Sequence, residues 1–318
     1  MKYAGLCCYY GQLPNYFEFW LESAKKNFKM DFFIITDKTT IEGYYDDLQK
    51  IQNIHVIYIS FNDLKYRIQQ FFDFEITLNS PYKLCDYRLT FGLVFKEILL
   101  DFDYFGWYDI DVILGDLNQL LYHNDDKPYD VIGINGHFTL LRNKKEFIYL
   151  FLESINKTNQ ASSYKKVFSS NHSCFFDEDY GLRKLIERFN FLDLRPYIAD
   201  INFWKEDFYC DLSKDAVFIK RDTINNKLYA CDEIKEYEII YAHFQKRTFK
   251  IETEVLDSYC IIPNKFTQNK DYVYNGKCRN GYFFKYYRDS MIARRINLST
   301  NFFLALKNKI SKIKLKDN

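Results

Sequence analysis

The sequence predicts an α/β fold in which a mixed, mostly parallel β-sheet is flanked by helices and followed by a basic helical C-terminal extension. Short apolar runs alternate with helical patterns in the first part of the chain, which is typical of parallel strands covered on both faces. The chain has 318 residues, of which 47% are hydrophobic and 19% aromatic. This is enough for a substantial core in one large domain or two small ones.

The predicted elements begin at the N-terminus. Residues 3–9 are a buried strand, and residues 15–28 carry apolar side chains at helical spacing. Residues 31–37 and 54–59 are two further strands, and residues 64–72 are a short helix. This order predicts neighbouring parallel strands with the helices packed against them.

Ligands of such sheets bind beyond the carboxyl ends of the strands. Tyr9 and Asp37 each follow a predicted strand. We therefore expect Tyr9 and Asp37 to contact a base and a ribose. The alternative is that both are ordinary loop residues.

Residues 80–100 are predicted to enter and form a helix, with Pro81 near its start. Lys83, Asp86 and Arg88 lie in its first turns. A helix N-terminus already favours anions, so added cations predict a phosphate or carboxylate site. The alternative is that Asp86 complements the helix dipole and pairs with a basic neighbour.

Asp109 and Asp111 are the central candidates, because they lie one residue apart within the apolar run FGWYDIDVILGDL. In one extended strand their side chains share a face, roughly 6–7 Å apart. Buried carboxylates need compensation, and Mg²⁺ or Mn²⁺ prefers oxygen ligands. Of three Asp-x-Asp copies, this one has hydrophobic residues on both sides. The alternative is a surface strand with two solvated acids.

Two later segments add candidates for sugar contacts. Residues 117–122 begin a short helix, and residues 131–143 are predicted to be a strand interrupted by glycines. Because glycine in a strand often marks a close approach of a ligand, we expect Asn135, His137 and Arg142 to contact sugar hydroxyls. For His137, the alternative is a structural histidine.

Asp177 and Glu178 precede a predicted helix and follow a helix expected at residues 145–156. One interpretation is that an acid of this group caps the helix. The other is that Asp177 or Glu178 removes a proton from an acceptor, as a general base does.

His243 follows a strand predicted at residues 236–241, with Lys246 and Arg247 close behind. Imidazole can bind Mn²⁺ beside carboxylates, so His243 is a candidate third metal ligand. Lys246 and Arg247 are candidates to neutralise a diphosphate. The alternative is a basic surface turn.

The eight cysteines form no C-x-x-C pair, and no secretory signal or membrane span is evident, so we expect a cytoplasmic protein. Residues 277–318 hold 11 Lys/Arg and 2 acids, against 33 and 41 in the rest of the chain. Residues 302–316 are predicted to be a basic amphipathic helix. Such a helix suits the inner face of a membrane. The alternative is a solvated helix packed on the domain.

The ordered motifs FFIITD, YKLCDYRLTFG, FGWYDIDVILGDL, GHFTLLRN, FDED and HFQKR resemble a bacterial glycosyltransferase family found in capsule and surface-polysaccharide loci. More distantly, they resemble retaining GT-A transferases of the glycogenin and yeast mannosyltransferase kind. The resemblance covers residues 1–250 and leaves 251–318 as an extension. It departs from the distant relatives at residues 103–108, where they have a Gly-Gly-x-Tyr turn, and it lacks their Gly-x-Lys-Pro-Trp motif.

This resemblance implies a GT-A-like, Rossmann-like fold. It further implies that Asp109 and Asp111 hold Mn²⁺ or Mg²⁺ and the donor, that His243 completes the metal site, and that Lys83, Asp86 and Arg88 line the donor pocket.

The function that follows is transfer of a hexosyl group from a nucleoside diphosphate sugar, expected to be a UDP-sugar. The acceptor would be a saccharide or lipid-linked oligosaccharide in surface-polysaccharide synthesis, with no nucleic-acid partner. The alternatives are a nucleotidyl- or phosphosugar transferase with the same metal–diphosphate site, and a catalytically inactive saccharide-binding protein of GT-A shape.

Overall fold

The computed structural model describes residues 1–154, 163–201, 208–212, 216, 218–232, 234–245 and 247–268. These residues all belong to one compact unit. Lys246 and the basic tail 277–318, with the helix expected at 302–316, lie outside the described residues. Within the described part, no helix combines the length and the apolar character needed to cross a membrane.

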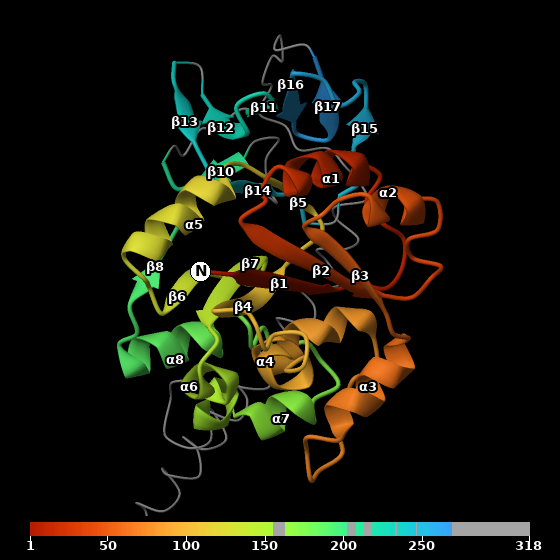
Figure 1. The fold of residues 1–318 in the computed structure, drawn as a ribbon, viewed down its shortest axis with the longest axis vertical. Helices are drawn as coiled ribbons and strands as arrows, with labels where there is room; N and C mark the ends of the chain where they lie inside the picture. Colours follow the sequence, from red (N-terminus) through yellow and green to blue (C-terminus); the bar gives the residue numbers. More distant parts are fainter. Residues whose placement is uncertain are drawn as a thin grey trace, which may run out of the picture. The chain divides into compact units, whose positions relative to one another are not determined.

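A seven-stranded sheet, sheet A, forms the centre of this unit (Figure 1). Its first four strands in space run parallel, in the order β3-β2-β1-β4, and β7 and β6 continue the sheet with antiparallel pairs. The predicted fold class, a mixed, mostly parallel sheet with flanking helices, is confirmed for this sheet. Its strands are β1 (Tyr3–Cys8), β2 (Met30–Thr36), β3 (Ile54–Tyr58), β4 (Tyr104–Tyr108), β6 (Val131–Asn135), β7 (Phe138–Arg142) and β8 (Asp193–Leu194).

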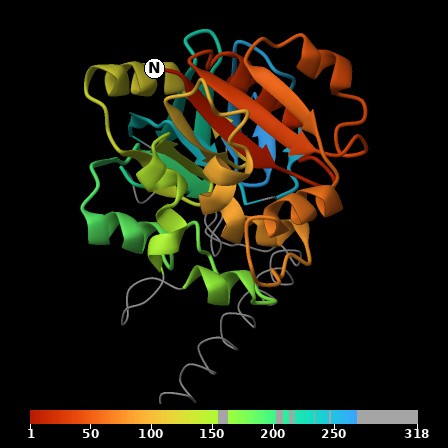
Figure 2. The same cartoon turned by 60° about the horizontal axis from the view of Figure 1, so that its bottom comes forward.

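Helices cover both faces of sheet A, as Figures 1 and 2 show. One face packs against α1 (Phe17–Lys25), α2 (Tyr45–Gln49) and α5 (Leu117–Asp126). The opposite face packs against α3 (Phe61–Gln69), α4 (Phe91–Val94), α6 (Lys145–Ile148), α7 (Tyr164–Phe168) and α8 (Leu182–Phe189).

Strand β4 explains why the sequence before Asp109 is continuously apolar. Tyr104 and Tyr108 face one core, where the Tyr108 ring stacks on Trp20 at 5.7 Å, whereas Phe105 and Trp107 face the other. Successive side chains of a strand point to opposite faces, so a strand buried on both faces needs apolar residues throughout.

Two smaller sheets follow. Sheet B has the order β10-β9-β14-β5, and sheet C the order β13-β12-β11-β16-β17-β15. Their strands are β5 (Val112–Leu114), β9 (Ile198–Ile201), β10 (Phe208–Cys210) and β14 (Tyr241–His243) in sheet B, and β11 (Phe218–Asp222), β12 (Lys227–Cys231), β13 (Glu236–Glu238), β15 (Lys250–Ile251), β16 (Ser258–Ile262) and β17 (Lys265–Thr267) in sheet C.

Sheet C crosses the expected boundary between residues 1–250 and the extension 251–318. In the described part of this segment, β16 pairs with β11 and with β17, so that residues on both sides of position 250 belong to one sheet. The boundary expected after residue 250 falls inside β15. These strands are only two to five residues long.

The segment expected to be one helix over residues 80–100 is a ten-residue 3₁₀ helix, η1 (Pro81–Thr90), followed by the single turn α4. Its buried side chains include Leu84, Tyr87 and Thr90, which are spaced three residues apart. This spacing puts them on one face at three residues per turn. The helix expected at 145–156 is likewise split into α6 and the 3₁₀ helix η2 (Leu150–Ser154).

Residues 131–143 form a hairpin, β6 and β7, instead of one interrupted strand. Gly136 and His137 lie at its turn, and Gly133 has a φ of +69°, a conformation that favours glycine. The glycines therefore mark a reversal of the chain and a bulge.

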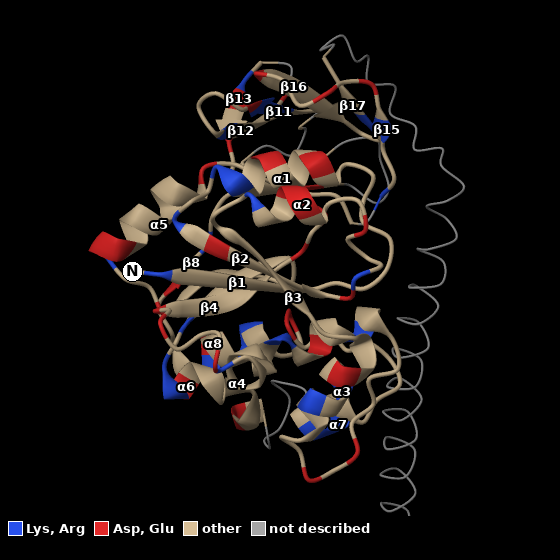
Figure 3. Cartoon of the chain, turned by 45° about the vertical axis from the view of Figure 1, so that its right-hand side comes forward, with Lys and Arg blue, Asp and Glu red and all other residues tan. Residues whose placement is uncertain are grey.

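Charged residues of both signs lie on the helices of both layers (Figure 3). One ion pair, between Glu22 and Arg221, is buried. The Nε of Arg221 is 3.2 Å from the Oε2 of Glu22, and Arg221 is fully buried. It joins α1 to β11 and hence the helical layer to sheet C. Loss of either partner would leave a buried, unpaired charge, which is strongly destabilising.

We predict that Asp125→Asn reduces stability by about 1 kcal/mol at pH 7. Asp125 accepts a hydrogen bond from the Tyr3 hydroxyl and pairs with Lys29 and the N-terminus. Burial opposes ionisation, but these partners prevail and hold the pKa of Asp125 below its usual value. The stabilisation is therefore complete above the unfolded-state pKa of about 3.9 and is lost as the pH falls through the folded-state pKa.

Chemical denaturation from pH 7 to pH 2 measures this effect. The matched control is Asp126→Asn, because Asp126 is exposed on the same helix. Equal stability of the two variants at pH 7 would contradict the role of Asp125.

Candidate functional site

Asp109 and Asp111 lie where the chain leaves β4 of sheet A and enters β5 of sheet B. This corrects the expectation that both belong to one extended strand. The two carboxylates are nevertheless close to each other across the bend between the strands. Both belong to one three-residue group with His243. Asp111 is 1% exposed and Asp109 is half-buried.

His243 is brought to these acids by the register of sheet B. In β14 it lies opposite Val112 of β5 and beside Asp200 of β9. Its Nε2 is 3.6 Å from Oδ2 of Asp111 and 4.0 Å from Oδ2 of Asp109, while its Nδ1 is 3.1 Å from Oδ1 of Asp200. The two nitrogens of the imidazole thus face different acids.

The donor set fits a divalent cation. One atom each of Asp109, Asp111 and His243 lie within 4.8 Å of one another, and two carboxylates with one imidazole suit Mn²⁺ or a similar ion. Ionised Asp200 can only accept, so Nδ1 of His243 donates to it and Nε2 is left toward the cation. Such outer carboxylates commonly orient metal-binding histidines.

His137 stacks on His243, with ring centroids 4.2 Å apart and an interplanar angle of 21°. Burial and the neighbouring charge of His243 lower the pKa of His137 to about 3, so this ring is neutral at physiological pH. Burial opposes the charge of His243 too, but Asp200 and Asp111 outweigh it and hold the pKa of His243 well above its usual value. His137, Asp200 and His243 form a second group with metal-binding geometry.

Arg88 connects the acid pair to the segment of Asp177. Its guanidinium contacts the carboxylate of Asp109 and the carbonyl of Gly136, and its Nη1 donates to Oδ2 of Asp177 at 2.8 Å. Burial lowers the pKa of Arg88, but the carboxylates of Asp109 and Asp177 outweigh this effect and hold the pKa well above its usual value. Arg88 therefore lies in the site, as expected, and occupies one oxygen of Asp109 while Oδ2 faces His243.

Asp177 and Glu178 differ in their surroundings. Asp177 is 1% exposed, its Oδ2 is bound by Arg88, and its pKa is raised well above the usual value by burial. Glu178 is half-buried and packs so closely on Gly136 that a β-carbon at that glycine would lie 2.2 Å from its Oε1. Burial raises the pKa of Glu178 as well. Neither acid provides a side-chain cap for α8, which begins after Gly181 without one.

Lys83 and Asp86 do not line the site, contrary to expectation. Both are buried, and Nζ of Lys83 donates to Asp86 and to the carbonyls of Val167 and His172. The ammonium has three donors, and all three are used. Asp86 accepts from the backbone of Cys174 and Phe176, so this ion pair holds the segment that leads to Asp177.

Tyr9 and Asp37 lie at the carboxyl ends of β1 and β2, as predicted. Burial is the main cause of the raised pKa of Tyr9, and the nearby charge of Asp111 adds to it. Asp37 accepts from Thr39 and Thr40, which stabilises its own turn. Asn135 donates to the hydroxyl of Tyr241 at the edge of the site.

Two basic residues have other roles than those expected. Arg247 is buried, and its Nη1 donates to Oδ1 of Asn264 at 3.1 Å. Arg142 donates to the carbonyls of Tyr129 and Pro128 and is therefore a structural residue. Lys246, the remaining candidate for a diphosphate contact, lies outside the described residues.

Asp200 and Gln245 were not anticipated. Nε2 of Gln245 donates to both carboxylate oxygens of Asp200, at 2.9 and 3.0 Å. A signal for Asp200 exists in the sequence, because it is an acid within the apolar strand Ile198–Ile201. No such signal exists for Gln245, whose position depends on a φ of +52° after β14.

A family model described as a family of unknown function (DUF6625) matches residues 6–270, which is most of the chain. The chain belongs to the DUF6625 family. The match includes Asp109, Asp111, Asp200 and His243, so the whole acid and histidine cluster is part of the DUF6625 region. No curated protein matches the chain.

Several solved structures match part of this DUF6625 chain. Mouse xyloside xylosyltransferase 1 is 10% identical, with a TM-score of 0.39 over 64% of this chain and 88% of that chain. The glycosyltransferase GlyE of Streptococcus pneumoniae is 14% identical, with a TM-score of 0.33 over 61% and 44% of the two chains. The galactosyltransferase LgtC, in complex with donor and acceptor sugar analogues, is 16% identical, with a TM-score of 0.27 over 60% and 65%.

We predict that the full-length DUF6625 chain binds Mn²⁺ and that Asp111→Asn weakens this binding at least about tenfold, because one of three ligands loses its charge. Isothermal titration calorimetry measures the affinity. Asp101→Asn is the matched control, since Asp101 is an exposed acid of another Asp-x-Asp motif. Equal affinities of the two variants would contradict the assignment of the site.

Proposed function

We propose that this protein is a metal-dependent glycosyltransferase that moves a sugar from a nucleoside diphosphate sugar, a UDP-sugar, to a saccharide acceptor. The resemblance of its motifs to capsule and surface-polysaccharide enzymes supports a role in the synthesis of such polymers. The proposed cofactor is Mn²⁺ or Mg²⁺.

The observation that carries this proposal is the convergence of Asp109, Asp111 and His243 at the carboxyl edge of sheet A. Strand β1 lies between β2 and β4 in the sheet. The chain continues from β1 to β2 on one side, and β4 lies on the opposite side of β1. This is a topological switch point, where open α/β sheets bind their ligands. A cation held at such an edge is well placed to bind the two phosphates of a nucleotide sugar.

The charge balance of the site supports a cationic ligand. In the part of the chain that the structure describes, five acids, at positions 109, 111, 177, 178 and 200, surround Arg88 and His243, and the His243 ring is cationic only while no metal is bound. The surplus of negative charge explains part of the raised pKa of Glu178, and a divalent ion would reduce it. When bound, such an ion stabilises the charge that develops on a leaving diphosphate.

The chain's own residues would orient these parts. Asp200 accepts the Nδ1–H of His243 and keeps the ring in place, and Gln245 fixes Asp200 in turn. Arg88 holds one oxygen of Asp109, so that the other oxygen points to His243. Tyr9 follows β1 and would contact the nucleoside.

Of the two proposed catalytic acids, Glu178 is the one that we assign to the acceptor, because Asp177 is buried against Arg88. Burial raises the pKa of Glu178, which makes this carboxylate a stronger proton acceptor than a solvated glutamate. In an inverting reaction Glu178 would take the proton of the acceptor hydroxyl; in a retaining reaction it would orient the acceptor.

The other candidates use the same geometry. A nucleotidyl- or phosphosugar transferase would place its substrate phosphates on the same cation, and an inactive relative would bind a saccharide without turnover. The products distinguish the three functions, because glycosyl transfer releases the nucleoside diphosphate.

We predict that the protein releases UDP from UDP-hexoses in the presence of Mn²⁺ and a saccharide acceptor. Glu178→Gln should lower this rate at least about tenfold, since general acid–base groups typically contribute 10²–10⁴-fold. Detection of UDP by a coupled assay, with a panel of UDP-sugars and acceptors, measures the reaction.

Asp179→Asn is the control, because Asp179 is exposed and pairs with Arg183 on the surface. Release of pyrophosphate from UTP and a sugar 1-phosphate would instead identify a nucleotidyltransferase, and release of UMP from a UDP-sugar would identify a phosphosugar transferase. Binding of a saccharide without any nucleotide product would identify the inactive alternative.

A further inference from the structure

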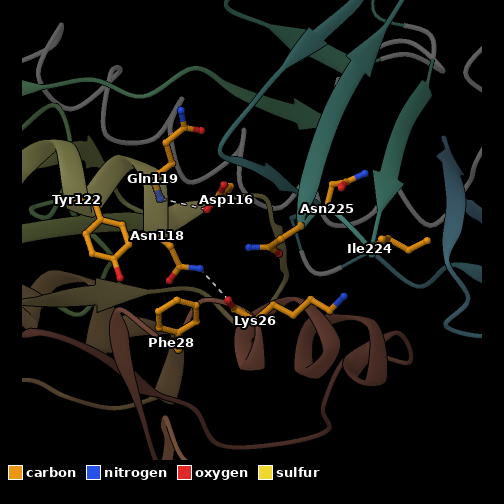
Figure 4. Close-up of a pocket in the computed structure, with 9 residues that line it drawn as sticks. Lys26, Phe28, Asp116, Asn118, Gln119, Tyr122, Ile224 and Asn225 are labelled. Carbon is orange, nitrogen blue, oxygen red and sulfur yellow. Dashed lines mark hydrogen bonds between the residues drawn. The ribbon is translucent and has the colours of Figure 1, made fainter.

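A cavity, drawn in Figure 4, is lined by residues that include Asp116. Asp116 lies beyond the end of β5 that is opposite to the acid cluster. The volume of the cavity is about 660 Å³, within the range of small-molecule sites. Asp111 precedes β5 and Asp116 follows it, so the two sites are separated along the chain by roughly 16 Å at 3.3 Å per residue. Its walls come from the end of α1, the start of α5 and the turn between β11 and β12.

Two exposed aromatic rings line one side of this cavity. Phe28 is 66% exposed and Tyr122 is 50% exposed, and Figure 4 shows both on the side opposite Ile224 and Asn225. Nζ of Lys29 lies 4.5 Å from the centroid of the Tyr122 ring and is itself held by Asp125. Exposure of a large aromatic ring to water is unfavourable in free energy, and a ligand that covers the ring removes this cost.

The charges of the cavity are already balanced by the protein. Lys26 pairs with Glu22 and donates to the carbonyl of Thr223. Asp116 pairs with Lys227 at 3.4 Å, and Lys227 also binds Glu238. No cation is therefore directed at an anionic ligand from the described walls, and a phosphate or a carboxylate is not favoured here.

The remaining polar groups are neutral. Tyr122, Gln119 and Asn225, which also line the cavity, carry a phenol or an amide group. Gln119 is held by Lys227 at its oxygen, and Asn225 donates to Asp222, so each amide has its other atom available in a fixed orientation.

The frame of the cavity is rigid. Asn118 accepts from the backbone of Lys29 and donates to the carbonyl of Lys26, and Asn226 donates to Asn27. These hydrogen bonds tie α5 and the turn of sheet C to the end of α1. A ligand would therefore meet a preformed site and need little ordering of side chains.

We propose that this cavity binds a neutral saccharide. A sugar ring offers faces of C–H groups, which pack on aromatic rings, and a rim of hydroxyls, which hydrogen-bond to neutral amide and phenol groups. The cavity supplies both, and its paired charges select against acidic sugars. This site is separate from the acid cluster and does not depend on the reaction proposed above.

The test is a titration of the 318-residue protein with maltotriose, cellotriose and mannotriose, followed by methyl NMR of Ile224. Ile224 is 69% exposed on the wall of the cavity, so its methyl signal reports occupancy there. We expect at least one trisaccharide to shift this signal. Tyr122→Ala and Phe28→Ala should each weaken the binding about five- to tenfold through loss of ring contact.

Tyr66→Ala is the matched control, because Tyr66 is a tyrosine on α3 outside the cavity whose exposure is close to that of Phe28. Mn²⁺ and UDP should leave the binding of the trisaccharide unchanged. The result is therefore independent of whether the acid cluster is a transferase site. The proposal is overturned if no trisaccharide shifts Ile224, if trigalacturonic acid binds more tightly than the neutral sugars, or if Tyr122→Ala and Tyr66→Ala behave alike. Thermal unfolding verifies that each variant is folded.

Discussion

The need to compensate acids at the junction of two sheets organises this molecule. Asp109 and Asp111 are withdrawn from bulk water where β4 ends and β5 begins, and uncompensated burial of carboxylates is costly. The compensation comes from two side chains, Arg88 and His243, and each of them contacts more than one acid. Arg88 joins Asp109 to Asp177, and His243 joins the acid pair to Asp200. Elements far apart in the sequence are thereby fixed around one point.

This arrangement depends on supports that do not touch the site. The buried Lys83–Asp86 pair holds the backbone of residues 174 and 176, and so sets the position of Asp177 and Glu178. The register of β14 against β5 and β9 places His243 between its acids. A polar cluster of this kind is useful only when its members are held within a few tenths of an ångström, which rigid strands achieve better than loops.

The sequence predicted the parts of the fold that rest on continuous apolar runs. Strands β1, β2 and β3 and helix α1 lie close to where periodicity put them, because each buries its side chains in a sheet covered on both faces. The acid pair and His243 could be found for a related reason, since charged or polar groups beside buried strands need an explanation.

Other features could not be predicted, because they depend on pairing between distant segments. The strands of sheet C are short, and their partners lie up to about 40 residues away. A glycine-containing run fits an interrupted strand and a hairpin equally well, and only the pairing of β6 with β7 decides. Lys83 and Asp86 have the composition of a ligand site, but their burial is set by the segment of Cys174, nearly 90 residues later.

The central claim is that Asp109, Asp111 and His243 hold a divalent cation that carries the diphosphate of an activated sugar. A crystal soaked with Mn²⁺ and UDP, with data collected at the manganese absorption edge, tests it most directly. The claim predicts an anomalous peak between these three side chains, with the diphosphate beside it at the ends of β1 and β4. An empty cluster with the nucleotide bound elsewhere would contradict it.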